Sequence, residues 1–118
     1  MKIIDLFSGG GGLSEGFRQT EKFQFVCHVE KDSSACLTLQ LRNVYYYLKN
    51  INKLNRYKDF LENKITLKEL FNSVPDTTIN DVLNYEINEE SLEAIFEFID
   101  LNLHGSKLDG IIGGPPCQ

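Results

Sequence analysis

The sequence predicts a parallel α/β fold, and three observations support this. An apolar run over residues 2–7 ends at a serine and four glycines, after which a helical pattern begins. A second apolar run over 23–29 ends in three charged residues and also precedes a helical pattern. A third, over 108–112, reads as a buried strand and ends in a loop of glycines and prolines. Strands that alternate with helices are typical of a parallel sheet with right-handed crossovers.

Between the second and last strands the sequence is mostly helical. A helix is expected from about Ser33, and from about residue 43 to residue 106 the pattern predicts a helical insert. Within it, 66–71 reads as a short helix, and Asn88 can cap a last helix that Gly105 ends. The apolar positions of this last helix fit one buried stripe: Leu92, Ile95, Phe96, Ile99 and Leu103. Residues 77–85 fit either a third strand or a helical turn.

Composition and charge limit the classes of function. The chain has 118 residues, 12 Lys and Arg against 17 Asp and Glu, and a net charge of −5. We expect a single globular domain, and a free-standing nucleic-acid binder is disfavoured because phosphate neutralisation needs clustered cations. No apolar run is long enough to span a membrane, and the first residues do not resemble a signal peptide, so we expect no membrane partner and a cytoplasmic location.

The cysteines and histidines do not suggest a disulfide or a metal site. Cys27 lies inside an apolar strand and Cys36 on a predicted helix, where packing is the expected role of a thiol. The odd number of cysteines favours reduced thiols. No C-x-x-C occurs and there are only two histidines, so no metal is expected.

The glycine turn after the first strand indicates a ligand site. Glycines let a ligand approach the backbone, and the helix that follows offers free N–H groups. The turn does not match a P-loop, since no Lys follows it, and G-x-G-x-x-G fails at its last position. Glu30 ends the second strand, where an acid in such sheets accepts bonds from two ribose hydroxyls. These features together predict a ligand that contains a nucleoside. Their spacing does not distinguish a nicotinamide dinucleotide from S-adenosylmethionine.

The loop after the last strand carries a candidate nucleophile. Pro115 and Pro116 fix two φ angles ahead of Cys117, and the glycines before them allow close approach of another group. The carboxyl end of a strand is also where α/β sheets bind ligands. A cysteine held stiffly there suits nucleophilic catalysis better than packing.

Taken together, these three segments resemble the DNA (cytosine-5) methyltransferase family. The segment DLFSGGGGLSEGF, from Asp5 to Phe17, resembles the family's first motif, which cradles S-adenosylmethionine. Residues 29–32, VEKD, resemble its second motif, and 113–118, GGPPCQ, its catalytic loop. The resemblance implies a Rossmann-like methyltransferase sheet, of which this chain carries only the amino-terminal strands and helices. Residues 1–118 would then be the amino-terminal part of a catalytic domain, with the helical insert at about 43–106.

The resemblance also implies a mechanism. The Cys117 thiolate adds to C6 of a cytosine flipped out of the duplex, which makes C5 electron-rich enough to accept a methyl group from S-adenosylmethionine. S-adenosylhomocysteine is the product, and no metal takes part. By the same resemblance Glu30 binds the ribose, Lys31 lies on the adenine side, and Asp81, or else Asp76, binds the adenine amino group. The other implied cofactor-binding residues are Asp5, Phe7, Ser8, Gly9, Gly11, Gly12 and Leu13, and the implied cytosine-binding residues are Pro116 and Gln118.

Several family motifs do not occur in these 118 residues. They are the acid that contacts cytosine N3, the Arg-x-Arg motif, the target-recognition region and the final helix. We therefore expect double-stranded DNA to be bound mainly by regions absent here, and the 118 residues alone to be inactive. We expect a prokaryotic enzyme, in a restriction–modification system. The alternatives are a non-catalytic or split-enzyme subunit that needs a partner chain, and an NAD-dependent enzyme.

Overall fold

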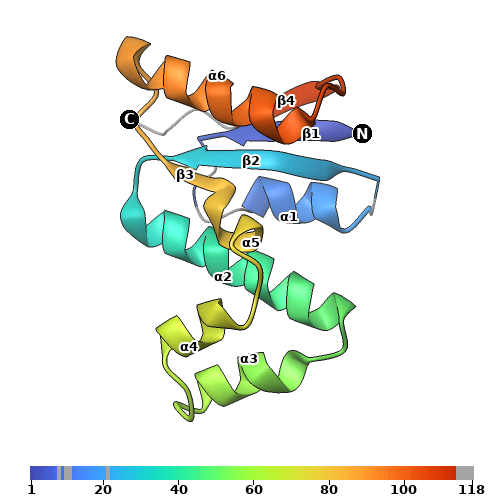
Figure 1. The fold of residues 1–118 in the computed structure, drawn as a ribbon, viewed down its shortest axis with the longest axis vertical. Coiled ribbons are helices and arrows are strands. Elements are labelled where there is room, and N and C mark those ends of the chain that lie inside the picture. Colours follow the sequence, from blue (N-terminus) through green and yellow to red (C-terminus); the bar gives the residue numbers. More distant parts are fainter. Residues whose placement is uncertain (8, 10–11, 21, 114–118) are drawn as a thin grey trace.

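The computed structural model describes residues 1–7, 9, 12–20 and 22–113, and the chain follows the predicted alternation of strands and helices (Figure 1). The strands and helices are β1 (Lys2–Leu6), α1 (Gly12–Arg18), β2 (Gln24–Glu30), α2 (Ser33–Asn50), α3 (Leu54–Leu61), α4 (Leu67–Asn72), α5 (Thr77–Asn80), β3 (Val82–Asn84), α6 (Glu89–Leu103) and β4 (Gly110–Gly113).

The four strands form one parallel sheet in the order β3-β2-β1-β4. Glu30 pairs in register with Asn84, and Leu6 pairs with both Val29 and Gly113. The carboxyl ends of all four strands therefore meet at one edge of the sheet, which we call the carboxyl edge. The fold class predicted from the sequence is confirmed.

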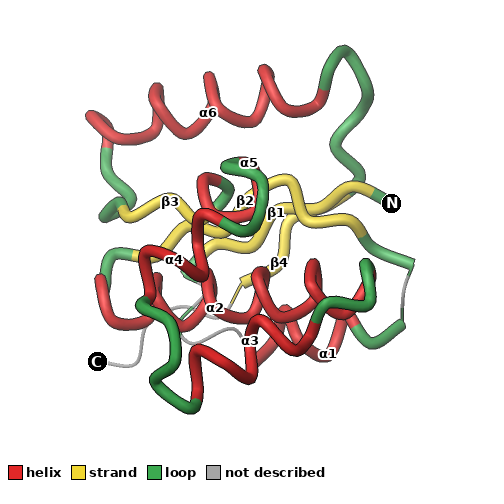
Figure 2. Tube along the Cα trace, turned by 60° about the horizontal axis from the view of Figure 1, so that its bottom comes forward, coloured by secondary structure: helices red, strands yellow, loops and turns green. Residues whose placement is uncertain are grey.

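Helices cover both faces of the sheet. Figure 2 shows α6 on one face and α1 and α2 on the other. On the α6 side, Ile95, Ile99 and Leu103 pack against buried residues of β1 and β2 such as Ile4 and Val29. On the other side, Cys36 and Leu39 of α2 pack with Val82 of β3. Burial of apolar surface on both faces holds the sheet between its helices.

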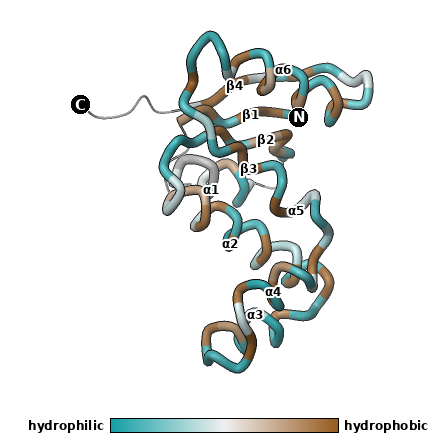
Figure 3. The backbone as a smooth tube through the Cα atoms, turned by 60° about the vertical axis from the view of Figure 1, so that its left-hand side comes forward, coloured by the Kyte–Doolittle hydropathy of each residue, from teal (hydrophilic) through white to brown (hydrophobic). Residues whose placement is uncertain are grey.

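A second apolar cluster joins α2 to the short helices that follow it. Val44 and Leu48 of α2 pack with Leu70 and Val74, and all four are nearly inaccessible to solvent. α3 and α4 lie beyond α2, away from the sheet (Figure 3). Residues 43–106 are thus mostly helical, and this cluster attaches α3 and α4 to the second half of α2, whereas α6 packs on the sheet.

Local signals in the sequence explain where the helices begin. Asp32 caps α2 by accepting a hydrogen bond from Ser34 N at 3.2 Å. Thr66 and Asn88 begin α4 and α6 with capping boxes, in which side chain and backbone bond reciprocally three residues apart. The predicted cap at Asn88 and the short helix after Thr66 are confirmed.

The structure differs from the sequence prediction at three places. Residues 77–85 contain both proposed elements in succession, α5 and then β3, so the segment predicted as an insert also supplies a strand to the sheet. Phe96 was expected in the buried stripe of α6 but is 57% exposed, because it lies one position around the helix from Ile95. β4 was expected to be buried, but it lies at the edge of the described sheet, and Ile111 is 60% exposed.

Within the described ranges, no helix is long and apolar enough to cross a membrane.

Candidate functional site

Glu30 joins two of the predicted motifs at the carboxyl edge. Its Oε1 accepts a hydrogen bond from Gly9 N at 3.0 Å, in the turn between β1 and α1. Its Oε2 accepts one from Asp32 N at 2.8 Å, where α2 begins. A carboxylate has about four lone-pair sites, so each oxygen retains capacity for another donor. The half-buried Glu30 is therefore fixed in orientation and can still accept bonds from a pair of vicinal hydroxyls.

The turn after β1 has a backbone suited to close approach of a ligand. Phe7 and Gly9 both have positive φ, 56° and 55°. Phe7 is 42% exposed although it directly follows a buried strand. A non-glycine residue in this region is strained, and such residues often occur at binding sites. Gly12 begins α1, so the turn leads directly into a helix amino terminus.

The main chain around Glu30 is held by neighbouring side chains. Cys36 Sγ donates to the Glu30 carbonyl oxygen at 3.3 Å. With its nitrogen facing the main chain, the Asn84 amide donates to the carbonyl oxygens of Glu30 at 3.2 Å and Lys31 at 2.9 Å. In the same orientation its oxygen accepts from Ser33 Oγ at 3.1 Å. These contacts tie the end of β2 to α2 and β3. The Lys31 side chain is exposed.

Asn84 is a residue of the carboxyl edge that sequence analysis missed. Its register with Glu30 places it beside the predicted ribose-binding acid. The signal was a polar residue directly after the apolar pair Val82 and Leu83. It could be used only if residues 77–85 were assigned to a strand, and the sequence left that choice open.

The end of β4 lies very close to the end of β1. A Cβ atom on Gly113 would lie 2.2 Å from the Leu6 carbonyl oxygen, closer than any real contact. Only glycine lets the two strands approach in this register. Gly113 therefore lies beside the end of β1 at the carboxyl edge.

Two predicted site residues contact other groups than Glu30. Asp5 is only 1% exposed, and its Oδ2 lies 3.4 Å from Nδ1 of the buried His28 on the neighbouring strand. Asp81 precedes β3, and its backbone oxygen accepts from His28 N at 2.8 Å. Its Oδ1 accepts from Asn43 Nδ2 at 2.8 Å. The structure thus does not bring Asp5 or Asp81 together with Glu30.

The other predicted residues fall outside what the structure describes. This holds for Ser8, Gly11, Pro116, Cys117 and Gln118, and for the side chain of Leu13. Their assignments stay predictions.

Two cysteines have environments that favour packing over reaction. Cys27 is fully buried, and burial raises the pKa of its thiol to about 12. Burial, with Glu30 and Asp32 nearby, also raises the pKa of Cys36. Since the thiolate is the nucleophile, both are unreactive near neutral pH. The packing role predicted for these two residues is confirmed.

Comparison with known proteins identifies the family. The family model described as C-5 cytosine-specific DNA methylase matches residues 1–75. Type II methyltransferase M.Bpa9945I of Bacillus paralicheniformis is 36% identical, over 100% of this chain and 31% of that protein. Type II methyltransferase M.AquIA of a Picosynechococcus species is 30% identical, over 99% of this chain and 32% of that protein. No solved structure matches.

The chain spans about a third of the length of these two curated relatives. The family match covers β1, the glycine turn, Glu30 and α2, and ends before β3 and β4. The chain belongs to the C-5 cytosine-specific DNA methylase family.

Proposed function

We propose that the polypeptide carrying this sequence methylates C5 of cytosine in double-stranded DNA, as part of a type II restriction–modification system. The observation that carries the proposal is the hydrogen bond between Gly9 N and Glu30 Oε1. It unites the glycine turn and the acid, the two motifs that the family uses for S-adenosylmethionine, at the edge of the sheet where ligands bind. The relatives named as type II methyltransferases support the biological setting.

The residues at the carboxyl edge fit S-adenosylmethionine. Glu30 retains lone pairs for the two ribose hydroxyls. The turn through Phe7 and Gly9, with the amino terminus of α1 at Gly12, offers backbone groups to the amino-acid portion. The cofactor supplies an electrophilic methyl group. We assign no cofactor contact to Asp5 or Asp81, because Asp5 is nearly inaccessible beside His28 and Asp81 precedes β3, three residues before its carboxyl end at Asn84.

In the proposed reaction Cys117 acts as the nucleophile. Its thiolate bonds to C6 of the flipped cytosine, and the resulting enamine makes C5 nucleophilic enough to take the methyl group. Loss of the C5 proton and elimination of the thiolate then restore the aromatic ring and the free enzyme. Pro116 and Gln118 are proposed to line the cytosine pocket. The DNA-reading regions lie outside these 118 residues, in the same polypeptide or in a partner chain.

Cofactor binding by the complete polypeptide tests this assignment. We expect calorimetry to show binding of S-adenosylhomocysteine and none of NAD. Glu30→Gln replaces one acceptor oxygen with an amide that faces an N–H donor, so affinity should fall about tenfold or more. Glu97→Gln, on the exposed side of α6, is the matched control and should bind normally. Tighter binding of NAD, or equal affinity in the two variants, would contradict the assignment.

A further inference from the structure

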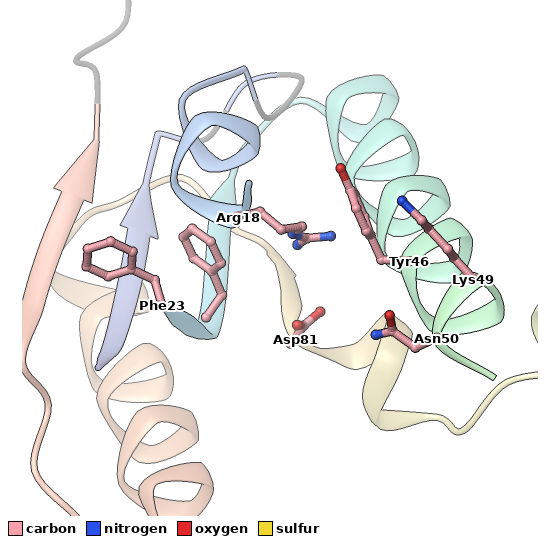
Figure 4. A pocket seen from close by; sticks show the side chains of 7 residues that line it. Arg18, Phe23, Tyr46, Lys49, Asn50 and Asp81 are labelled. Carbon is pink, nitrogen blue, oxygen red and sulfur yellow. The ribbon is translucent and has the colours of Figure 1, made fainter. Parts of the chain in front are cut away.

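A pocket of about 510 Å³ lies outside the candidate cofactor site. It opens between the end of α1, the start of β2 and the last turns of α2, near the edge where the strands begin. Phe23, Phe25 and Tyr46 form aromatic walls, and Arg18, Lys49, Asn50 and Asp81 supply the polar groups (Figure 4). None of the residues at the carboxyl edge lines it.

Arg18 is the central charge of this pocket. Its Nη2 donates to Asn43 Oδ1 at 2.8 Å, and its Cζ lies 4.7 Å from the centre of the Tyr46 ring. The guanidinium is half-buried, and burial lowers the pKa of Arg18 despite nearby Glu15 and Asp81. Buried charges are ordinarily paired, because removal from water is costly.

Among the described residues, no carboxylate forms an ion pair with Arg18. The nearest acid in sequence, Glu15, is engaged elsewhere: its Oε2 lies 3.3 Å from Arg42 Nη1, and its Oε1 accepts from the Tyr46 hydroxyl. Asp81 accepts from Asn43 rather than from Arg18. Arginine has five N–H donors, and one of them makes a hydrogen bond among the described residues, so the guanidinium retains capacity to bind a ligand.

A second cation and an amide face the same space. Figure 4 shows Lys49 and Asn50, at the end of α2, directed toward the pocket from the side opposite Arg18. Residues 42–75 contain seven Lys and Arg against three Asp and Glu, in a chain whose net charge is −5. The pocket therefore opens beside the most basic part of the described chain.

Asp81 is the only carboxylate among the described lining residues. Burial raises the pKa of Asp81 to about 6, although His28 and Arg18 act in the opposite direction. Because this value lies below neutral pH, the carboxyl group is mostly ionised at pH 7 and offsets part of the positive charge of Arg18 and Lys49.

We propose that this pocket binds a phosphate group, carried either by a small phosphate ester of nucleotide size or by the DNA backbone. Arg18 and Lys49 outnumber the single carboxylate of Asp81, so the described lining is net positive and favours an anion such as phosphate. The guanidinium fork of Arg18 matches two phosphate oxygens, while Lys49 acts as a point charge and Asn50 as a neutral donor. The volume lies within the usual range of small-molecule sites.

The test uses the complete polypeptide and three probes: inorganic phosphate, thymidine 5′-monophosphate and a short DNA duplex. Lys49→Met is the main variant, because this exposed side chain makes no described ion pair and its loss leaves the fold intact. Lys68→Met, on α4 in the same basic segment but outside the pocket, is the matched control. Arg18→Met is the second variant, with circular dichroism to check its folding.

We expect Lys49→Met and Arg18→Met to weaken binding of at least one probe about tenfold, and Lys68→Met to leave binding unchanged. Loss of thymidylate binding with normal duplex binding assigns the site to small phosphate esters. Weaker duplex binding, with the slope of its salt dependence reduced by about one, assigns it to the DNA backbone. Equal affinities of the parent, Lys49→Met and Lys68→Met for all three probes would overturn the proposal.

Discussion

At the scale of single residues, the candidate site depends mainly on the side chain of Glu30. One carboxylate accepts backbone N–H groups from the turn after β1 and from the start of α2. Charge-assisted bonds of this kind are about twice as strong as neutral ones. The position of this acid at the end of the second strand predicted a ligand-binding role for it. Its bonds could not be predicted, because they depend on how two distant turns meet in space.

Gly113 gives a direct test of the contact between β4 and β1. A methyl group on this residue would overlap the Leu6 carbonyl, so Gly113→Ala should lower the free energy of unfolding by about 1–3 kcal/mol. Gly16→Ala is the control, because a Cβ there meets nothing within 4 Å and alanine favours the helix. Urea denaturation measures both. Equal stability of Gly113→Ala and the parent would show that the strands do not approach so closely.

Asp81 should make stability depend on pH. Its pKa is about 6 when folded against 3.8 in the reference state, so between these values the folded protein keeps a proton that the unfolded chain has lost. The free energy of unfolding should therefore fall as pH rises through 4 to 6. Asp81→Asn keeps the acceptor for Asn43 and should remove this fall, whereas Asp76→Asn, at an exposed position, should not. A parallel pH profile for the parent and Asp81→Asn would exclude this effect.

At the scale of elements, helix starts are set locally and can be tested locally. Asn88 accepts from Ser91 N at 2.9 Å, and Ser91 Oγ accepts from Asn88 N at 3.0 Å. Asn88→Ala should cost about 1 kcal/mol, since it removes an N-cap. Asn55→Ala, on exposed α3, should be neutral within a few tenths of a kcal/mol. If thermal denaturation gives the two variants the same midpoint, the capping box does not stabilise α6.

Helices and strands differ in how well the sequence predicts them. Caps such as Asp32, Thr66 and Asn88 depend on neighbours within a few residues, and the sequence predicted these helices well. β3 has only three residues, too few for a periodic pattern, so its pairing with β2 decides its structure. The exposure of Phe96 and Ile111 depends on which surfaces are covered by other helices and strands. A local sequence pattern does not predict that coverage. Asn84 at the candidate site was missed for the same reason.

At the scale of the whole molecule, the described sheet has the order of the first four strands, 3-2-1-4, of a doubly wound fold. The chain spans about a third of the length of the two relatives described above. We predict that these 118 residues alone transfer no methyl group to DNA, because the family's DNA-reading motifs do not occur in them. An assay with tritiated S-adenosylmethionine, comparing this polypeptide with the complete one, measures this. Incorporation of label into DNA by the 118 residues would disprove it.

The most direct test of the central claim is to identify the methylated nucleoside. Plasmid DNA is incubated with the complete polypeptide and S-adenosylmethionine, digested, and analysed by mass spectrometry and chromatography against standards. The proposed chemistry predicts 5-methyl-2′-deoxycytidine as the only new nucleoside, abolished by Cys117→Ser, while that variant still binds S-adenosylhomocysteine. A methyl group on an exocyclic nitrogen, or undiminished 5-methylcytosine with Cys117→Ser, would contradict it.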